Sequence, residues 1–382
     1  MTALALLAAF IWVYLLFLHG GFWQVAVPGT VPAIPAAGRI PSVAVVIPAR
    51  DEAAGIGTTV TSLLKQDYPG EVRIFVVDDH STDGTGDLAR RIGAELGAED
   101  RLTVIEAREL PVGWTGKLWA VSEGLDAAKG FSSDYILMTD ADITHGPGGL
   151  AQLVARAKLE DLDLISQMVR LHCVSFAERS LIPAFVFFFF MLYPPRWIAD
   201  PAERTAGAAG GCMLIRAPAL ARIGGIGAIQ GALIDDCALA TAIKKSGGRI
   251  RLDVTRDTSS SRNYGSFGEI WSMIARNAYT QLHYSPLLLA GTLAGLFLTY
   301  LAPPLFVWYG HGWVRFLGLV AWAMMAVAFR PTLRLYERSP GWGVALPLIA
   351  AFYAAATFGS AVNYWRGRGG QWKGRAQAAH GA

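Results

Sequence analysis

Three clusters of acidic residues are the part of this sequence best suited to chemistry. Asp140 and Asp142 flank a single alanine, so both carboxylates can reach one hard cation that keeps open positions for phosphate oxygens. Like charges held this close repel each other, so a site built from them usually contains a cation or hydrogen-bond donors. The other two clusters lie upstream: Arg50-Asp51-Glu52, which follows Pro48, and Asp78-Asp79 with the polar residues up to Thr85.

Helix capping is a competing interpretation for some of these residues. Asp83 and Thr85 stand where a helix is expected to begin, a position at which both residue types bond to free backbone N–H groups, and capping is favoured for these two. Asp78 and Asp79 come directly after an apolar run, where capping is a less adequate explanation. A third metal ligand is the less favoured interpretation of His145, three residues after Asp142.

The elements that must position these clusters alternate along the chain. Short β-branched runs predict strands, and helical patterns follow them. Such alternation indicates an α/β domain with a mostly parallel sheet and right-handed crossovers, in which ligands bind outside the carboxyl ends of the strands. All three clusters stand at such ends and are expected to converge on one crevice. The predicted strands are 43–47, which is expected to stop at Pro48, 72–77, 102–105 and 135–138; the predicted helices are 52–65, 83–97 and 117–128.

The composition is that of a membrane-attached protein. Of 382 residues, 53% are hydrophobic and 16% are charged, against about 25% charged in typical soluble domains, which disfavours disorder and a purely soluble enzyme. The net charge of +3 is unevenly distributed: residues 39–283 carry −4 and the residues after His283 carry +7. No Asp, Glu, Lys or Arg occurs before Arg39. The acidic body lacks the basic surface that nucleic-acid binding needs. Three widely spaced cysteines argue against a disulfide framework or a zinc site and fit a reducing compartment: Cys173, Cys212 and Cys237.

Long apolar segments occupy both ends of the chain. Residues 3–18 form an uninterrupted apolar run, interpreted as an uncleaved anchor because a signal peptide would need a basic start and a cleavage site. About 20 residues are needed for each membrane span. Three further membrane helices are therefore expected, at residues 286–308, 313–329 and 342–362.

The topology of these helices has two solutions. The positive-inside rule puts the basic loop 330–338 and the basic tail 364–375 in the cytoplasm, but a single span between them puts them on opposite sides. Either one apolar segment is re-entrant or interfacial, or one basic cluster is external. Pro303 and Pro304 make the first segment the best candidate for a broken helix.

The opening of the body resembles family 2 glycosyltransferases with the GT-A (Rossmann-like) fold, which transfer sugar from a nucleotide diphosphate. The resemblance implies that segment 48–52 and the first of the paired acids, Asp78 or Asp79, hold the base and ribose; the contacts in that segment fall to Pro48, Arg50 and Glu52. It implies that Asp140-Ala141-Asp142 binds Mg²⁺ or Mn²⁺ with the diphosphate. A metal there would neutralise charge on the leaving group. Nothing resembles the Gly-x-x-x-x-Gly-Lys loop, so a P-loop kinase is disfavoured.

The same resemblance implies a catalytic base at Asp235-Asp236, which precedes a helical pattern at residues 237–245. Such a base would deprotonate the acceptor hydroxyl, with inversion at the anomeric carbon. Asp236 is favoured over Asp235, and helix capping is the alternative for both. The small-residue run 207–212 lets a substrate approach the backbone or simply forms a tight turn; in the resemblance it lines the acceptor pocket, through Gly210, Gly211 and Cys212.

Two basic residues are candidates for the diphosphate. Lys117 could reach a phosphate from a helix start, or it is solvated. Many processive members of the superfamily carry Gln-x-x-Arg-Trp after the base, and the matching stretch 271–281 has Arg276 and Tyr279 but no Arg-Trp. Transfer of one sugar is therefore favoured over polysaccharide synthesis. Arg276 either contacts the diphosphate or has a surface or lipid-headgroup role.

An aromatic segment at residues 181–197 separates the metal motif from the base. It is too short for an easy span, and Pro183 is expected to break its start. Tyr193, Arg196 and Trp197 suit a headgroup boundary. An interfacial segment near the acceptor site is therefore favoured over core packing, and a lipid acceptor follows.

The whole-chain pattern is similar to the hopene-associated glycosyltransferases, with ceramide glucosyltransferases as more distant relatives. The likeness rests on the aromatic segment and on residues 210–214, 231–240 and 364–375. It implies a multi-pass enzyme of hopanoid metabolism in the bacterial inner membrane, with a cytoplasmic catalytic domain, a nucleotide-sugar donor, a lipid acceptor and no nucleic-acid partner. The alternatives are a processive polysaccharide synthase and a non-catalytic membrane scaffold with a degenerate nucleotide-binding domain. The expected domains are an anchor and linker at 1–38, the GT-A domain at 39–283, and a membrane region with a basic tail at 284–382.

Overall fold

The computed structural model describes residues 1–32, 39–367, 371–372 and 375–376. The chain divides into two compact units, which we call the sheet unit and the helical unit. The sheet unit contains Val27–Leu171 and Ile198–Arg262, and the helical unit contains Met1–Ala26, His172–Trp197 and the described chain from Asn263 to Gly367. The body predicted at residues 39–283 therefore contributes to both units.

An eight-stranded sheet organises the sheet unit, with strands in the order β3-β2-β1-β4-β7-β6-β8-β5. Strands β1 to β4 pair in parallel, whereas β7 is antiparallel to both β4 and β6. The predicted α/β class is confirmed, with a mixed sheet in which a parallel half carries the predicted strands. The strands are β1 (Val43–Ala49), β2 (Val72–Asp78), β3 (Leu102–Glu106), β4 (Tyr135–Thr139), β5 (Ile143–His145), β6 (Leu164–Arg170), β7 (Cys212–Arg216) and β8 (Ile250–Ser260).

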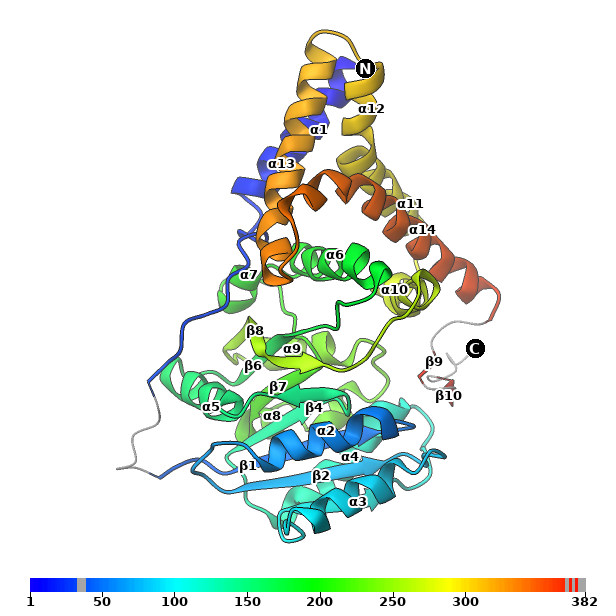
Figure 1. Ribbon diagram of the computed structural model, residues 1–382. Helices are drawn as coiled ribbons and strands as arrows, with labels where there is room; N and C mark the ends of the chain where they lie inside the picture. The colour runs from blue at the N-terminus through cyan, green and yellow to red at the C-terminus, as the bar shows by residue number, and fades with distance from the viewer. Residues whose placement is uncertain (33–38, 368–370, 373–374, 377–382) are drawn as a thin grey trace. The chain divides into compact units, whose positions relative to one another are not determined.

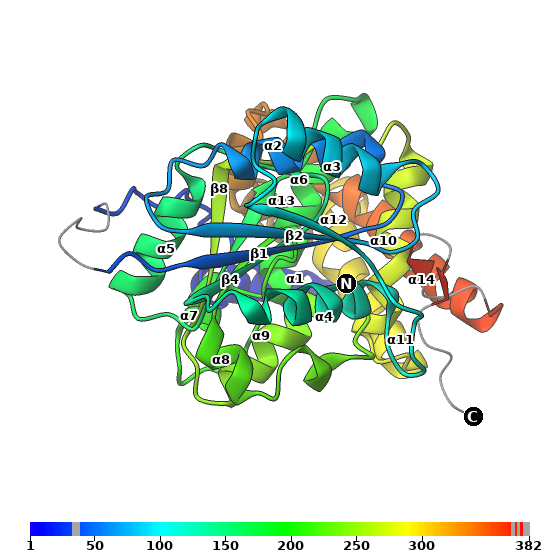
Figure 2. The same ribbon diagram turned by 90° about the horizontal axis from the view of Figure 1, so that it is seen from below.

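Helices cover both faces of this sheet. Figure 2 shows α2 and α3 on one side of strands β1 and β2 and α4 on the other. Because β1 lies between two helical layers, every one of its residues is buried, which explains its continuous apolar run. The helices of this unit are α2 (Ala53–Leu64), α3 (Thr85–Glu95), α4 (Gly116–Ala127), α5 (Gly149–Leu159), α8 (Ala217–Arg222) and α9 (Asp235–Lys245).

Strand β1 does not stop at Pro48, as the sequence predicts, but continues to Ala49. Proline has no N–H to give to a neighbouring strand, so it is normally confined to edges. Here β4 pairs only with residues Val43 to Val46, while β2 pairs along the whole of β1. Pro48 therefore lies beyond the last residue paired with β4, where its missing N–H disrupts no bond on that side.

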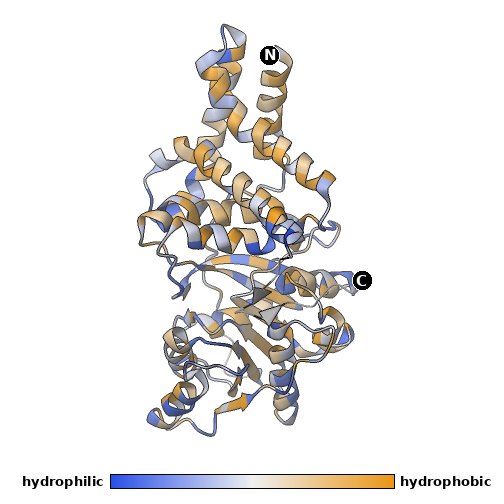
Figure 3. Cartoon of the chain, turned by 90° about the vertical axis from the view of Figure 1, so that its right-hand side faces the viewer, coloured by the Kyte–Doolittle hydropathy of each residue, from blue (hydrophilic) through white to orange (hydrophobic). Residues whose placement is uncertain are grey.

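The helical unit contains three helices that are long and apolar enough to cross a membrane, as the sequence predicts: Pro286–Tyr309, Trp313–Leu335 and Pro340–Trp365. The second continues beyond its predicted end at residue 329, so Arg330 and Arg334 of the predicted basic loop lie in the helix. Apolar residues dominate the helices near the marked N-terminus in Figure 3. In Figure 1, α1 lies beside α12 and α13. Helix α1 has 16 residues, fewer than the about 20 of a full span, and its role as an anchor stays a prediction. The helices are α1 (Thr2–Phe17), α6 (Phe176–Leu192), α10 (Phe267–Gln281), α11 (Pro286–Leu296), α12 (Ala302–Tyr309), α13 (Trp313–Leu335) and α14 (Leu346–Trp365), and α7 (Pro195–Ala199) lies where the chain enters the sheet unit.

The first of these apolar segments is irregular where the paired prolines predict it. A π-turn at Phe297–Leu301 joins α11 to α12 directly before Pro303. Proline lacks the N–H that would bond to the carbonyl four residues earlier, which is that of Thr299. The indole Nε1 of Trp12 donates to this carbonyl at 2.8 Å instead. The segment thus bulges without breaking. Of the predicted basic tail, Arg368 and Lys373 lie outside the described residues.

Most of the aromatic segment lies in one helix, α6, which ends at Leu192, and its last three residues lie in the short helix α7. The expectation that Pro183 breaks the start of the segment is wrong. Helix α6 begins at Phe176, seven residues before the proline, and continues through it. A capping box fixes this start, because the Ser175 hydroxyl accepts from the Glu178 backbone N–H while the Glu178 carboxylate accepts from the Ser175 N–H. The helix therefore begins upstream of the proline, at this capping box.

Glu178 also holds a second chain segment in place. Its side chain is fully buried, and its Oε1 accepts from the Tyr264 backbone N–H at 2.7 Å and lies 2.8 Å from His172 Nδ1. Burial alone would raise the pKa of this carboxyl, but the bonds from Tyr264, His172 and the helix start outweigh it and lower the pKa to about 2. The carboxylate is charged at neutral pH and ties the start of α6 to the chain that leads into α10.

We expect Glu178→Ala to destabilise the helical unit by about 2 kcal/mol or more, because several buried donors lose their acceptor together. Thermal unfolding of the purified protein in detergent measures this. Since the folded-state pKa is depressed, the stabilisation is present above about pH 4 and is lost as the pH falls towards 2. Glu269→Ala is the matched control, because Glu269 sits at the exposed start of α10 and should cost about 1 kcal/mol or less. Equal losses for the two variants would contradict the role given to Glu178.

Candidate active site

The strand ends bring the predicted clusters to one edge of the sheet. Ala49 pairs with Asp78 in the parallel register of β1 and β2, and the Asp79 backbone N–H donates to the Ala49 carbonyl. Strand β4 ends at Thr139 beside β1, so Asp140 follows at the same edge. The three clusters therefore stand together, as the sequence predicts from the rule for parallel sheets.

The first two clusters bind each other's backbone. The Arg50 guanidinium donates to the Asp79 carbonyl and lies 3.4 Å from the fully buried Asp79 carboxylate. Asp83 accepts from the backbone N–H of Ala53 at the start of α2, and Thr85 accepts from that of Glu52. The sequence predicts that both residues cap the helix that begins beside them, but the N-cap of α3 is Gly84, which makes no side-chain cap bond. Of the predicted capping, the structure shows only the bond from the Thr85 N–H to Asp83 Oδ1; the other two bonds hold the start of α2.

Asp78 is held at the start of α3. Its Oδ1 accepts from the Ser81 backbone N–H at 2.9 Å. A Cβ on Gly86 would clash with its Oδ2, so any larger residue there would force this carboxylate to move. Asp78 of the second cluster is thus held by a backbone hydrogen bond from Ser81 and by the close approach of Gly86 in α3.

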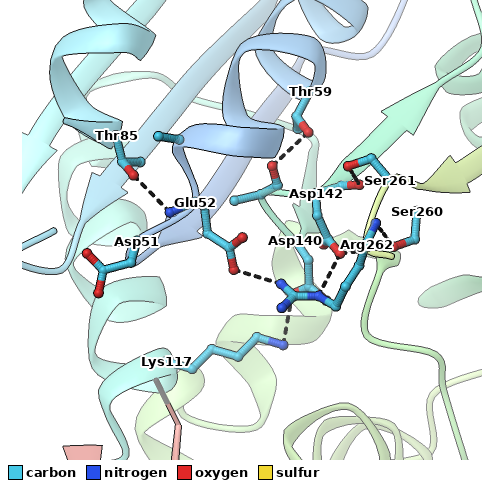
Figure 4. Close-up of polar contacts among 12 residues, drawn as sticks. Asp51, Glu52, Thr59, Thr85, Lys117, Asp140, Asp142, Ser260, Ser261 and Arg262 are labelled. Carbon is cyan, nitrogen blue, oxygen red and sulfur yellow. Dashed lines mark hydrogen bonds and ion pairs between the residues drawn. The ribbon is translucent and has the colours of Figure 1, made fainter. Parts of the chain in front are cut away.

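The two acids of the metal motif contact different cations of the protein (Figure 4). Asp140 accepts from the Lys117 ammonium at 2.9 Å. Asp142 is buried and accepts at Oδ2 from the Ser260 hydroxyl at 2.9 Å and from Arg262 Nε at 3.0 Å. Helix α2 supports the loop between them, because the Thr59 hydroxyl donates to the Ala141 carbonyl.

The residues present fit a hard divalent cation. Carboxylates supply the oxygen ligands that Mg²⁺ and Mn²⁺ prefer, and a two-carboxylate site leaves positions for water and phosphate. Burial, together with the charge of Asp142, raises the pKa of Asp140 despite Lys117, and a bound cation would relieve that excess negative charge. Among the described residues, no group of three His, Cys, Asp or Glu side chains gathers in a metal-binding arrangement. His145 is buried with a pKa lowered to about 4 and lies 3.0 Å from the Thr139 hydroxyl.

Asp235 and Asp236 form the first turn of α9. Asp236 accepts at Oδ2 from the Gly210 backbone N–H at 2.9 Å and at Oδ1 from the Cys237 N–H at 2.7 Å. Burial and the neighbouring charge of Asp235 raise its pKa to about 6, against the opposing effect of Lys117. A carboxylate with this pKa is ionised at neutral pH yet basic enough to accept a proton.

Lys117 links the metal motif to the acidic pair. Its Nζ lies 2.9 Å from Asp140 Oδ1 and 3.1 Å from Asp235 Oδ2, although these carboxylates are far apart in sequence. Burial disfavours its charge, but Asp140 and Asp235 outweigh this and raise its pKa above the ordinary value. Its place near the start of α4 is fixed by Thr115, whose hydroxyl accepts from the Leu118 N–H. Lys117 is therefore a permanent cation among acids, and the solvated alternative does not describe it.

A pocket opens at this cluster. Lys117, Asp140, Gly210 and Asp235 give it a polar side. A Cβ on Gly210 would lie 3.3 Å from Asp236 Oδ2 and 3.6 Å from Lys117 Nζ, so the glycine keeps this space open. The remaining lining is largely apolar: Pro48, Leu118, Val121, Met138, Met213, Ile226, Ile229 and Leu239.

The other predicted site residues lie in different surroundings. The Gly211 carbonyl accepts from the Thr139 hydroxyl at 2.7 Å, and Cys212 is fully buried at the start of β7, where burial raises the pKa of its thiol to about 12. Arg276 lies on α10 in the helical unit, whereas all the other predicted site residues belong to the sheet unit.

Sequence reasoning missed Ser260 and Arg262. Arg262 Nη2 donates to Glu52 Oε1 at 2.7 Å while its Nε donates to Asp142, so one guanidinium joins the first cluster to the third. The only signal available in the sequence is a basic residue that directly follows a polar strand ending in serines. Nothing in that pattern names its partners.

We expect Lys117→Met to move the acid limb of a pH–rate profile to higher pH by about one unit, because Lys117 favours the charged form of Asp236. The profile of sugar transfer between pH 5 and 8 measures this shift. Lys129→Met is the control, since Lys129 pairs with Asp126 on an exposed surface and its loss should leave the profile unchanged. An unshifted profile for Lys117→Met would show that Lys117 and Asp236 titrate independently.

Comparisons with known proteins give the family of this chain. The family described as "Glycosyltransferase like family 2" matches residues 41–262. A 4,4'-diaponeurosporenoate glycosyltransferase from Staphylococcus aureus (strain bovine RF122 / ET3-1) is 35% identical over 104 residues, which are 27% of this chain and 24% of that protein. The chain thus matches about a quarter of the length of this curated relative.

A solved structure shares the fold over nearly the whole chain. It is the mannosyltransferase PcManGT from Pyrobaculum calidifontis in complex with GDP-Man and Mn²⁺, which is 22% identical at a TM-score of 0.54, with 95% of this chain and 98% of that chain covered. The predicted GT-A fold is confirmed by this likeness. Since the family match spans more than half of the sequence and includes all three acidic clusters and Asp235-Asp236, the chain belongs to family 2 of the glycosyltransferases.

Proposed function

We propose that this protein is a membrane-bound, metal-dependent, inverting glycosyltransferase that moves one sugar from a nucleotide-diphosphate sugar to a lipid acceptor. The observation that carries the proposal is the cluster in which Lys117 joins Asp140 of the metal motif to Asp235 of the acidic pair. The sugar carbon that carries the donor diphosphate and the acceptor hydroxyl must meet at one point. This cluster contains a cation and carboxylates that can act on both.

The donor would lie along the strand ends. The base and ribose would be held by Pro48, Arg50, Glu52 and the first of the paired acids, Asp78 or Asp79. Lys117 would contact the diphosphate, which is the role that a buried cation at a helix start suits. Arg276 is the further candidate for the diphosphate.

Asp140 and Asp142 would hold Mg²⁺ or Mn²⁺, and when bound such an ion supplies neutralisation of the charge on the leaving diphosphate. Asp236 would take the proton from the acceptor hydroxyl. The acceptor oxygen then forms a bond to the anomeric carbon, and the bond from that carbon to the diphosphate breaks. The configuration at the anomeric carbon is thereby inverted. The raised pKa of Asp236 supports its assignment as the base. Gly210, Gly211 and Cys212 are the proposed acceptor side; of these, Gly210 lines the pocket and Cys212 is fully buried.

A lipid acceptor is supported by the helical unit. Its three long apolar helices have the length and composition of membrane spans. Tyr193, Arg196 and Trp197 follow the aromatic helix α6 and combine aromatic and basic side chains as headgroup boundaries do. Tyr193 accepts from Gln281 at 2.6 Å, and Trp197 packs its ring on His19. The proposed location is the bacterial inner membrane with the catalytic unit in the cytoplasm, and the proposed acceptor class is hopanoid.

The test is incubation of the purified full-length protein with a panel of nucleotide sugars, Mn²⁺ and a bacterial membrane lipid extract that includes hopanoids, followed by mass spectrometry. We expect one lipid to gain the mass of a single sugar, and Asp236→Asn to form this product about 10²- to 10⁴-fold more slowly. A ladder of products differing by one sugar each would indicate a polysaccharide synthase instead. Failure to bind UDP, GDP or Mn²⁺ in a calorimetric titration would indicate a non-catalytic scaffold.

A further inference from the structure

Arg262 makes two ion pairs that the proposed reaction does not use. Its Nε lies 3.0 Å from Asp142 Oδ2 and its Nη2 lies 2.7 Å from Glu52 Oε1 (Figure 4). The Asp142 and Glu52 side chains are only 10% and 16% exposed, while Arg262 is 37% exposed. An ion pair between largely buried carboxylates and a two-pronged guanidinium has a fixed geometry, unlike most surface pairs.

The chain around Arg262 hydrogen-bonds to several atoms of Asp142. Ser260 donates its hydroxyl to the same Oδ2 that Arg262 contacts. Ser261 donates both its backbone N–H and its hydroxyl to the Asp142 carbonyl. The end of β8 therefore fixes both the backbone and one carboxylate oxygen of Asp142.

The two oxygens of the Asp142 carboxylate therefore have different surroundings. The described donors to the Asp142 side chain bond to Oδ2, which leaves Oδ1 for a cation in the site. Groups that bond to the outer side of a metal ligand orient it and are worth about 10- to 100-fold in metal affinity. Arg262 also neutralises part of the charge that Glu52, Asp140 and Asp142 would otherwise concentrate at one edge.

We propose that Arg262 is a positioning residue, which orients Asp142 for the divalent cation and couples it to Glu52 of the nucleotide-binding segment. The inference rests on the proposed metal site. It assigns to Arg262 no contact with substrate and no part in proton transfer. Removal of the guanidinium should therefore weaken cation binding without removing a cation ligand.

The experiment measures Mn²⁺ binding to the full-length protein in detergent by water-proton relaxation enhancement, with Mn²⁺ alone and with UDP or GDP added. We expect Arg262→Met to raise the Kd for Mn²⁺ by about 10- to 100-fold. Arg262→Lys keeps the charge but not both prongs, and should restore part of the affinity. Arg90→Met is the matched control, because Arg90 pairs with Asp87 on an exposed helix face; it should bind Mn²⁺ like the wild type.

The possible outcomes separate this inference from the function on which it rests. Absence of Mn²⁺ binding to the wild type in all conditions would overturn the metal site and the role of Arg262 together. Wild-type binding with an unchanged Kd in Arg262→Met would overturn the role of Arg262 alone. Tighter binding in Arg262→Met would also overturn it, because Arg262 would then compete with the cation. Thermal unfolding of each variant shows whether a loss of affinity comes from loss of fold.

Discussion

Asp236→Asn should lower the rate of sugar transfer by about 10²- to 10⁴-fold, the contribution of a positioned general base. Asparagine keeps the shape of aspartate and can still accept from the Gly210 backbone N–H, which bonds to Asp236 Oδ2 at 2.9 Å. It cannot take a proton from an acceptor hydroxyl. Nucleotide binding should be unchanged, because Asp236 is a proposed contact of the acceptor and not of the donor. Initial rates and a calorimetric titration with UDP or GDP measure the two effects separately.

The pH dependence of the wild type provides an independent measurement. The pKa of Asp236 is raised to about 6 by burial and by the charge of Asp235. A base must be deprotonated to act, so kcat/KM should fall as the pH decreases through about 6 and level off above it. The residual activity of Asp236→Asn should not show this acid limb.

Asp235→Asn is the matched comparison. Asp235 accepts from Lys117 at 3.1 Å, so its loss should disturb the cluster and lower the rate by about tenfold while the acid limb moves to lower pH, because the charge of Asp235 raises the pKa of Asp236. If Asp235→Asn instead removed the acid limb and Asp236→Asn kept it, the base would be Asp235. Equal and complete loss in both, with UDP and GDP binding also lost, would indicate a purely structural role for the start of α9.

The parts of the fold that the sequence predicts well are those set by local pattern. The strands β1 to β4 have short β-branched runs and the intervening helices have their own periodicity, and each lies within one or two residues of its predicted position. Their parallel pairing then brings the acids after β1, β2 and β4 to one edge. That part of the site follows from topology, without knowledge of any side-chain contact.

The prolines show how tertiary structure changes a local expectation. Pro48 sits inside β1 because β4 no longer pairs there, and Pro183 sits inside α6 because Ser175 and Glu178 start the helix upstream. The irregularity at Pro303 was predictable because the lost hydrogen bond is a local property. Its compensation by Trp12 was not, because Trp12 lies 287 residues from its partner Thr299.

The cations of the site are the part that sequence reasoning locates least well. Lys117 was a candidate for phosphate, yet its bonds to Asp140 and Asp235 depend on how α4, β4 and α9 meet. Arg262 was not a candidate, because an arginine after a strand has many possible partners, and Glu52 lies 210 residues away. Acidic clusters can be recognised in a sequence because several carboxylates stand close together. A single basic residue that neutralises them has no such pattern around it.

Replacement of Asp142 should have the second large effect on activity. We expect Asp142→Ala to lower kcat/KM by about 10²-fold or more, because the proposed site loses one of two carboxylates that would hold the cation, and metal-ion stabilisation of a leaving diphosphate amounts to several kcal/mol. Asp142 is buried and bonds to Ser260 and Arg262, so alanine also leaves these donors without an acceptor. Asp142→Asn separates the two effects, since it keeps an oxygen acceptor but loses the charge. Both variants should show this loss of kcat/KM, and only Asp142→Ala should unfold at a clearly lower temperature.

The metal dependence decides how such a loss is interpreted. Treatment of the wild type with EDTA should abolish transfer and added Mn²⁺ or Mg²⁺ should restore it, whereas no concentration of either ion should restore Asp142→Asn to the wild-type rate. Asp161→Asn is the control, because Asp161 forms an exposed pair with Arg216 in the same unit and its loss should leave transfer unchanged. Full activity of Asp142→Asn with Mn²⁺ present would refute the assignment of Asp142 to the cation. Full wild-type activity in EDTA would leave Lys117 and Arg262 as the groups that neutralise the site, since each already pairs with one carboxylate of the motif.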